Sequence, residues 1–221
     1  NPHFATQVNV GGTHNVLEVA RQVGGLKVVY VSSGAVYGKQ EGPLTEDTPM
    51  IPSDPYGATK AMSEHLCHQY HATYGVDVLC ARLFFLYGPP NIPGPNSGFN
   101  TNLFGALAGK DVNLLKGRDQ KGDWTYIEDA ARGVVLMLKA QNVTNRSFNI
   151  ATGTFNPIDE IVEMVRKHAP CGNKIEVGPG VNLERGAPLD ITLAREQLGY
   201  EPKYDLEAGV KAFKEWLDQN G

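Results

Sequence analysis

The chain has 221 residues, of which 41% are hydrophobic and 20% charged, and its net charge at neutral pH is −4. This composition is typical of a soluble globular protein, and the mildly acidic charge does not favour a nucleic acid or an anionic membrane surface as a partner. No apolar run is long enough to span a bilayer, and the three cysteines have no metal-ligand spacing, which predicts reduced thiols in a cytoplasmic protein.

The first predicted elements are a helix and a strand. A helix is expected within residues 1–24, because apolar side chains recur at helical spacing and Gly24-Gly25 provides a C-terminal cap. The apolar run at residues 28–33 is typical of a parallel strand that is buried on both faces. Such a strand delivers Ser32 and Ser33 at its carboxyl end, which is where open α/β sheets bind their ligands.

A loop and a second helix are predicted next. Residues 38–55 contain four prolines and an acidic cluster, which indicates a loop that wraps the site instead of forming a core element. A helix is predicted for residues 55–74, because Asp54 lies in its cap region and Gly75 follows its last turn.

Tyr56 and Lys60 carry the chemistry of this helix. They are four residues apart, so they lie one turn apart on the same face. Because a phenol has an ordinary pKa of about 10, a tyrosine that acts as a base at neutral pH needs a stabilised phenolate, and a neighbouring ammonium group supplies this. The Tyr-x-x-x-Lys spacing also occurs by chance on helices, but the strand and the serines before it favour a proton-transfer site.

The later elements alternate between strands and helices. Residues 76–90 indicate a second buried strand, in which Arg82 requires an ion pair because an isolated buried charge is costly. Short strands are expected within residues 111–117 and 147–153, and helices near 102–108 and within 156–170.

Five segments occur in a recognisable order: VVYVSSGAVYG, PYGATK, ARLFFLYGPP, DWTYIEDAARGVVLML and LGYEP. Together they resemble the extended short-chain dehydrogenases/reductases, in particular nucleotide-sugar epimerases of the UDP-glucose 4-epimerase type. The resemblance implies an α/β fold, a partial Rossmann doubly wound parallel sheet with a smaller C-terminal substrate-binding region. Residues 1–90, with a return strand and helix near 123–153, would belong to the dinucleotide-binding domain. Residues 91–122 and 154–221 would form the substrate-binding region.

The resemblance also implies roles for three catalytic residues. Tyr56 would remove the proton of a sugar hydroxyl while hydride passes to NAD, and would return the proton after the keto-sugar has rotated. Lys60 would hold the nicotinamide ribose and stabilise the phenolate, and Ser33 would orient the transferred proton. Ser33 is preferred to Ser32 because it lies four residues before Tyr37, which is the family's spacing.

NAD is the implied cofactor, with Asn9, Tyr56, Lys60 and Phe84 as its expected contacts. Upstream of the segment that residues 9–13 resemble, family members carry a Gly-rich turn that binds the dinucleotide pyrophosphate. No G-x-x-G-x-x-G motif occurs in this chain, so a fragment of a longer protein is expected. The residue that distinguishes NAD from NADP belongs to that upstream part, and the choice between them stays open.

The implied substrate contacts are Ser33, Phe85, Asn102, Lys121 and Arg185. Asn102 resembles an asparagine that binds a substrate phosphate, although an N-cap is the alternative. Arg185 resembles a phosphate-binding arginine, and its alternative role is that of a solvated surface residue.

Three positions depart from the family pattern. Phe85 replaces the usual Asn or Thr that touches the sugar, and Ala187 replaces a usual acidic residue. Gly122 replaces an arginine that grips the nucleotide diphosphate, for which Lys121 or Arg118 could substitute.

The sequence therefore predicts an NAD-dependent 4-epimerase of a nucleotide sugar. A homodimer through helices near residues 9–21 and 56–74 is implied by the resemblance. A dehydratase would carry Asp-Glu where Gly34-Ala35 stands. That difference argues against dehydration, although a related reductase or dehydratase remains an alternative, as does a catalytically inactive fragment or assembly partner.

Overall fold

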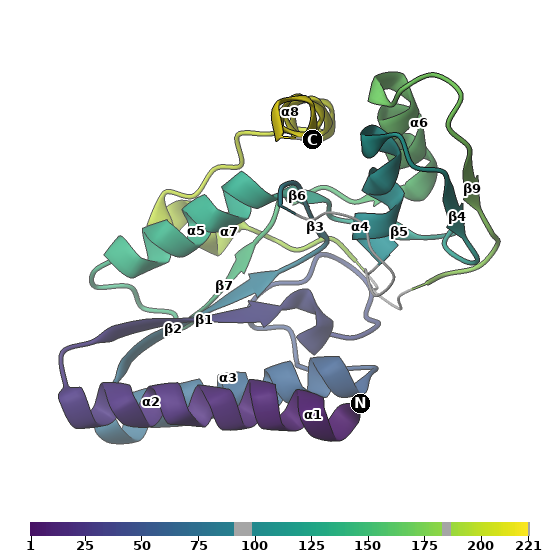
Figure 1. The fold of residues 1–221 in the computed structure, drawn as a ribbon. Coiled ribbons are helices and arrows are strands. Elements are labelled where there is room, and N and C mark those ends of the chain that lie inside the picture. The colour runs from purple at the N-terminus through teal and green to yellow at the C-terminus, as the bar shows by residue number, and fades with distance from the viewer. Residues whose placement is uncertain (91–98, 183–186, 221) are drawn as a thin grey trace.

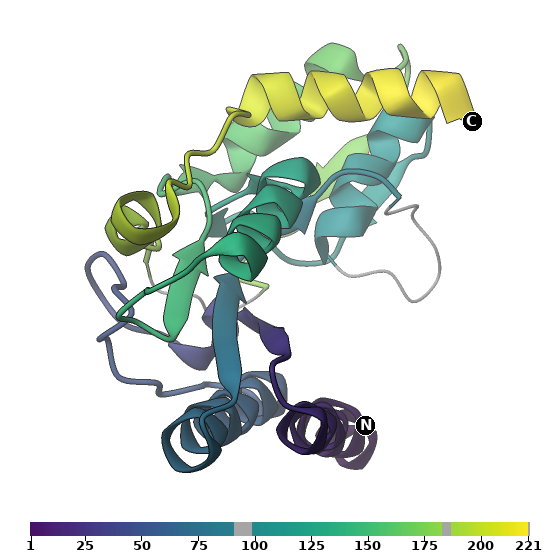
Figure 2. The same cartoon turned by 90° about the vertical axis from the view of Figure 1, so that its left-hand side faces the viewer.

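A three-stranded parallel sheet lies between two layers of helices in the computed structural model, which describes residues 1–90, 99–182 and 187–220 (Figures 1 and 2). The strand order is β1-β2-β7, so the second strand in sequence is central. Helices α2 and α3 cover one face and α5 covers the other. The bounds of these elements are β1 Lys27–Ser33, β2 Asp77–Leu83, β7 Ser147–Ile150, α2 Gly12–Val23, α3 Pro55–Tyr74 and α5 Ile127–Lys139.

The two predicted apolar strands differ in burial. In β2 every residue from Val78 to Leu83 is buried, because β1 and β7 flank it and helices cover both faces. In contrast, β1 pairs with β2 alone among the described strands, and Val31 is 45% exposed. Only Ser32 of β1 is buried, so the prediction that the first strand is buried on both faces is wrong for most of β1.

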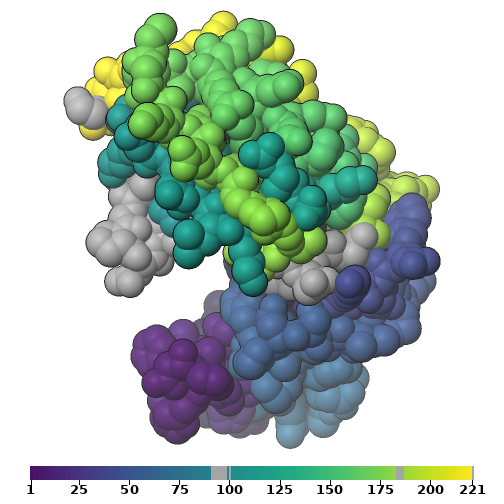
Figure 3. Space-filling model, turned by 90° about the vertical axis from the view of Figure 1, so that its right-hand side faces the viewer, coloured from purple at the N-terminus to yellow at the C-terminus, as the bar shows by residue number. Residues whose placement is uncertain are grey.

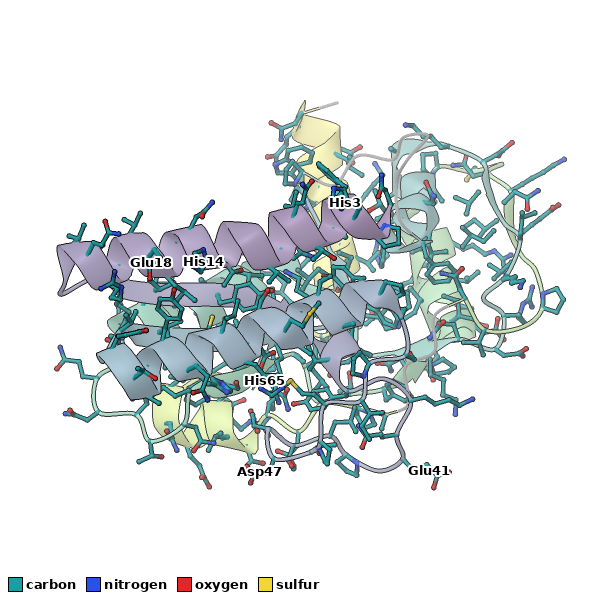
Figure 4. All side chains as sticks on the ribbon, turned by 90° about the horizontal axis from the view of Figure 1, so that it is seen from below. His3, His14, Glu18, Glu41, Asp47 and His65 are labelled. Atoms are coloured by element: carbon teal, nitrogen blue, oxygen red, sulfur yellow. The ribbon has the colours of Figure 1, made fainter. Side chains whose placement is uncertain are left out.

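The N-terminal helical segment runs through α1 (Pro2–Thr6), a π-helical turn η1 (Gln7–Gly11) and α2. Gly24 ends it with a φ of 72°, as the predicted cap requires. The segment lies side by side with α3 (Figure 4), and the Tyr70 hydroxyl on α3 donates to Glu18 at 2.7 Å.

The predicted loop at residues 38–55 contributes to the core. Leu44 is buried and forms a bridge with Leu189, while Glu46 accepts a hydrogen bond from the Asn149 backbone N–H at 2.7 Å. Its Glu41 and Asp47 lie at the outer rim (Figure 4). The loop therefore also anchors the C-terminal segment to β7, which its composition did not indicate.

The remaining elements are η2 Gly34–Val36, β3 Leu86–Tyr87, α4 Phe99–Leu103, η3 Phe104–Ala108, β4 Val112–Leu114, β5 Lys121–Gly122, β6 Thr125–Tyr126, β8 Asn156–Pro157, α6 Ile158–His168, β9 Ile175–Val177, α7 Thr192–Leu198 and α8 Leu206–Asn220. Of these, η2 packs on α3, and α7 packs on β7 and α5. The short strand pairs form a second region with α4, η3, α6 and α8. Strand β4 pairs in parallel with β9, β3 in parallel with β6, and β5 is antiparallel to β8.

One large cluster of buried apolar side chains joins the sheet to this second region, since it includes residues of β2, α6 and α8. Figure 3 shows the side of the molecule that faces the carboxyl end of β1. On this side the surface has a hollow between the purple-to-blue N-terminal part and the teal-to-green part. None of the helices in the described ranges is both long and apolar enough to cross a membrane.

Candidate active site

The carboxyl end of β1 presents Ser33. Its backbone is extended, with φ −152° and ψ 146°, and its Oγ accepts a hydrogen bond from the Ala35 N–H at 3.1 Å as the cap of η2. The Phe84 ring lies against the next residue, because a Cβ built on Gly34 would be 2.5 Å from this ring. A glycine after Ser33 therefore lets Phe84 lie close to the end of β1.

The first turn of α3 meets this strand end. Asp54 caps the helix by accepting the Gly57 N–H at 2.7 Å. A Cβ on Gly57 would lie 2.5 Å from the Ala35 carbonyl oxygen, so only glycine permits this approach. The contact brings the start of α3, and Tyr56 with it, to the residues that follow Ser33.

Tyr56 and Lys60 lie together at this junction, as their spacing predicted. The Lys60 Nζ is 5.8 Å from the Tyr56 ring centroid and 5.0 Å from that of Tyr30, and it donates to the Val31 carbonyl oxygen at 2.8 Å. The Tyr56 side chain is 46% exposed, and its hydroxyl has no hydrogen-bond partner within the described ranges. A phenol open to a ligand and a held ammonium group are the parts that a tyrosine base requires.

The electrostatic surroundings of Lys60 favour this role. Burial lowers the pKa of Lys60, whereas the nearby Glu64 carboxylate acts in the opposite direction. A half-buried ammonium is less screened by water than an exposed one, so it stabilises a neighbouring phenolate more strongly.

Asn9 lies in the π-helical turn η1 and is tied to α3. Its Nδ2 donates to the Thr59 Oγ1 at 2.8 Å, and its carbonyl oxygen accepts from the Ser63 Oγ at 3.1 Å. Single π-helical turns are frequent at functional sites. A pocket of about 340 Å³ is lined by Asn9, Val31 and neighbouring residues of η1, α2 and β1, so it adjoins the carbonyl that binds Lys60.

Phe85 and Gly122, two departures noted separately in the sequence, form one structural unit. The buried Phe85 ring stacks on Trp124, with centroids 5.1 Å apart and planes inclined by 27°. A Cβ on Gly122 would lie 2.1 Å from the Phe85 Cδ2. The phenyl ring therefore fills the space that a side chain at position 122 would need. A phenylalanine at position 85 thus requires a glycine at position 122.

We expect Gly122→Ala to destabilise the protein by about 1–3 kcal/mol, because the Phe85 ring must leave its position on Trp124. In a Phe85→Val background the same change is expected to cost little, which gives a coupling energy of at least about 1 kcal/mol. Urea unfolding of the four proteins measures this. Gly12→Ala is the matched control, since nothing lies within 4 Å of its Cβ position. Equal losses from Gly122→Ala in both backgrounds would contradict the coupling.

The other expected substrate contacts have different outcomes. Lys121 is exposed on β5, directly before Gly122. Asn102 is the fourth residue of α4, so the alternative that it serves as an N-cap is wrong. Arg118 contacts the Val177 carbonyl oxygen and Asp159, and Ala187 is buried. Arg185 lies outside the described residues.

Sequence reasoning overlooked Glu64, a fully buried carboxylate one turn after Lys60. It pairs with Arg82, whose Nη2 lies 2.8 Å from its Oε2, which confirms the predicted ion pair of that arginine on the central strand. Glu64 also lies close to His68 and Cys80 in an arrangement that could suggest a metal site. The Arg82 guanidinium already neutralises the carboxylate, so this cluster is an ion pair with polar neighbours. The spacing of residues 56, 60 and 64 along one helix face was the available signal.

Comparison with known families agrees with this geometry. Residues 1–151 match the sequence profile of the NAD dependent epimerase/dehydratase family. A UDP-glucuronate 4-epimerase of Thermodesulfobacterium geofontis is 30% identical over 227 aligned residues, covering 100% of this chain and 68% of that protein.

Two solved structures have the same fold. The UDP-glucose 4-epimerase of Thermotoga maritima, solved with UDP-glucose, superposes with a TM-score of 0.88 at 26% identity, over 100% of this chain and 72% of that one. The UDP-glucuronic acid 4-epimerase of Bacillus cereus, in complex with UDP-glucuronic acid and NAD, gives a TM-score of 0.82 at 29% identity, over 96% and 68% of the two chains.

Proposed function

Because the chain belongs to the NAD-dependent epimerase/dehydratase family, we propose that it is an NAD-dependent 4-epimerase of a nucleotide sugar, with UDP-glucose and UDP-galactose as its substrate and product. One observation carries the proposal: the start of α3, with Tyr56 and Lys60, meets the carboxyl end of β1, with Ser33. The similarity to UDP-sugar 4-epimerases supports the substrate class.

The residues at this junction fit the nicotinamide ribose end of NAD. Lys60 uses one N–H on Val31 and retains further donors for a ribose hydroxyl, while Tyr56 is open on its outer side. We therefore assign Tyr56, Lys60 and Phe84 as contacts of NAD. Asn9 is also assigned as a contact of NAD, because it lines the adjoining pocket. When bound, NAD supplies the acceptor and donor of hydride that inversion at a sugar carbon requires.

In the proposed mechanism, Tyr56 takes the proton of the substrate hydroxyl on its phenolate oxygen and returns it in the reverse step. Lys60 keeps the phenolate stable through its charge, which the Val31 carbonyl holds in place. Ser33 donates a hydrogen bond to the same substrate oxygen and so orients the proton transfer.

The remaining substrate contacts are assigned from the family resemblance. Asn102 and Lys121 would bind the nucleotide diphosphate, where lysine offers a point charge. Arg185 lies outside the described residues and is given the same role from its sequence alone. By the same resemblance, Phe85 would lie next to the sugar and would give it an apolar neighbour in place of a polar one. Its ring is buried and stacks on Trp124.

Incubation with NAD and UDP-glucose tests the function. We expect UDP-galactose to form, and NAD to quench the tryptophan fluorescence of the purified protein. Accumulation of a 4-keto-6-deoxy sugar would instead identify a dehydratase. Failure both to retain NAD and to show quenching would favour the alternative of an inactive assembly partner.

We also propose a homodimer through α2 and α3, supported by an exposed apolar stripe of Val16, Val19 and Val23, which are 53%, 56% and 66% exposed. Val19→Glu is expected to convert the dimer to monomer in sedimentation velocity, because a charge would be buried at the interface. Val135→Glu, on the opposite helical layer, is the control and should remain dimeric. A monomeric unmodified protein would contradict the proposal.

We further propose that the chain has two parts and that the enzyme is cytoplasmic. Residues 1–90, with 123–153, would form the dinucleotide-binding part, and residues 91–122 with 154–221 the substrate-binding part. The shared core predicts that the two parts unfold in one transition. A cytoplasmic enzyme accords with the free cysteines.

A further inference from the structure

Glu64 joins every strand of the three-stranded sheet to α3. Its carboxylate accepts hydrogen bonds from Ser32 on β1 and from Ser147 on β7, the latter at 3.1 Å. Arg82 on β2 binds both of its oxygens, through Nε at 3.1 and 3.0 Å and Nη2 at 2.8 Å. All four side chains are at least nine-tenths buried.

Such a junction is weak evidence for stability by itself. Removing a carboxylate and a guanidinium from water is costly, and well-packed apolar residues often replace a buried ion pair without loss. Hydrogen bonds are directional, because each one fixes a donor atom relative to an acceptor atom. Apolar side chains cannot hold neighbouring groups in place in this way.

The Ser32 bond links the two elements that carry the proposed catalytic residues. Ser32 directly precedes Ser33 on β1, and Glu64 follows Lys60 by one turn of α3. A second link runs between the same elements, from the Lys60 ammonium to the Val31 carbonyl oxygen. Two successive residues of β1 are thus tied to two successive turns of α3, immediately before Ser33.

We propose that Ser32 is a positioning residue: its hydroxyl, held by Glu64, fixes the end of β1 against α3 and so sets the place of Ser33 relative to Tyr56 and Lys60. The catalytic part of this proposal rests on the proposed epimerase function. Ser147 makes the equivalent bond to Glu64 from the far strand β7, which carries none of the three catalytic residues.

Ser32→Ala and Ser147→Ala form a matched pair for the test. Each removes one buried hydroxyl from the same carboxylate, with 3% and 6% exposure of the two serines. The Ser147 hydroxyl also contacts the His68 Nε2 at 3.0 Å, so Ser147→Ala should lose at least as much thermal stability as Ser32→Ala. Only Ser32→Ala is expected to lower kcat, by about 10- to 100-fold with little change in KM, because small misplacements of reacting groups have effects of this size.

Amide hydrogen exchange gives a second readout that requires neither cofactor nor turnover. The Ala35 N–H binds the Ser33 Oγ, so a displaced Ser33 should speed exchange at Ala35 in Ser32→Ala and leave it unchanged in Ser147→Ala. Equal effects of the two variants on kcat, an unchanged kcat in Ser32→Ala, or unchanged exchange at Ala35 would overturn the proposal. If the unmodified protein does not epimerise UDP-sugars, the proposed function fails, and the exchange comparison still decides the role of Ser32.

Discussion

Tyr56→Phe is expected to lower the rate of UDP-glucose epimerisation by about 1,000-fold, because the variant lacks the phenol oxygen that we propose exchanges the proton of the substrate hydroxyl. The rest of the site should persist. Tyr56 is 46% exposed and its hydroxyl has no partner within the described part of the chain, so the free energy of unfolding should change by less than about 0.5 kcal/mol. NAD should still bind, since Lys60 keeps its contact with Val31.

Tyr74→Phe is the matched control for this experiment. It is the same substitution at the opposite end of α3, on a ring that is 57% exposed and lies under Arg21. Coupled-enzyme turnover and thermal melting of the two variants separate a chemical effect from a structural one. Turnover of Tyr56→Phe near that of the unmodified protein would refute the assignment of the base.

The sequence predicts well those features of the fold that are determined by residues close together in the chain. The ends of α3 follow from Asp54 and Gly75, whose cap conformations are local properties of the chain. The placing of Tyr56 beside Lys60 follows from the helix repeat alone. The position of β1 at the sheet edge does not, because the number of neighbours of a strand depends on segments far away in the sequence.

In the candidate site, too, contacts between residues far apart in the sequence could not be predicted. Phe85 and Gly122 look like two independent departures in sequence, and only the packing of one ring against one Cα makes them a single change. Glu64 lies at helical spacing after Tyr56 and Lys60, but a glutamate on a helix is usually solvated, so the sequence alone does not predict its burial. Its burial becomes apparent once β1, β2 and β7 are placed side by side, because each contributes a donor to it.

Arg82→Met is expected to have the largest effect on stability, about 3–5 kcal/mol, because it leaves the Glu64 carboxyl group buried without its counterion. Arg82 also donates to the Tyr37 hydroxyl at 2.7 Å and to the Glu46 carbonyl oxygen at 3.0 Å, so the segment between β1 and α3 loses two contacts as well. Urea unfolding monitored by fluorescence measures the loss. Arg195→Met is the control, since its ion pair with Glu201 is exposed and should contribute less than about 1 kcal/mol.

The double variant Glu64→Met with Arg82→Met separates charge from packing. If the loss in Arg82→Met comes from an unpaired buried charge, removing the carboxylate should restore at least half of the lost stability, because neither ion then remains in the core. If the loss came from the packing of the arginine alone, the second substitution would lower stability further. Recovery of stability without recovery of kcat would show that apolar side chains can replace the contribution of the Glu64–Arg82 pair to folding but not its contribution to the active site, which includes the bond to Ser32 and the charge near Lys60.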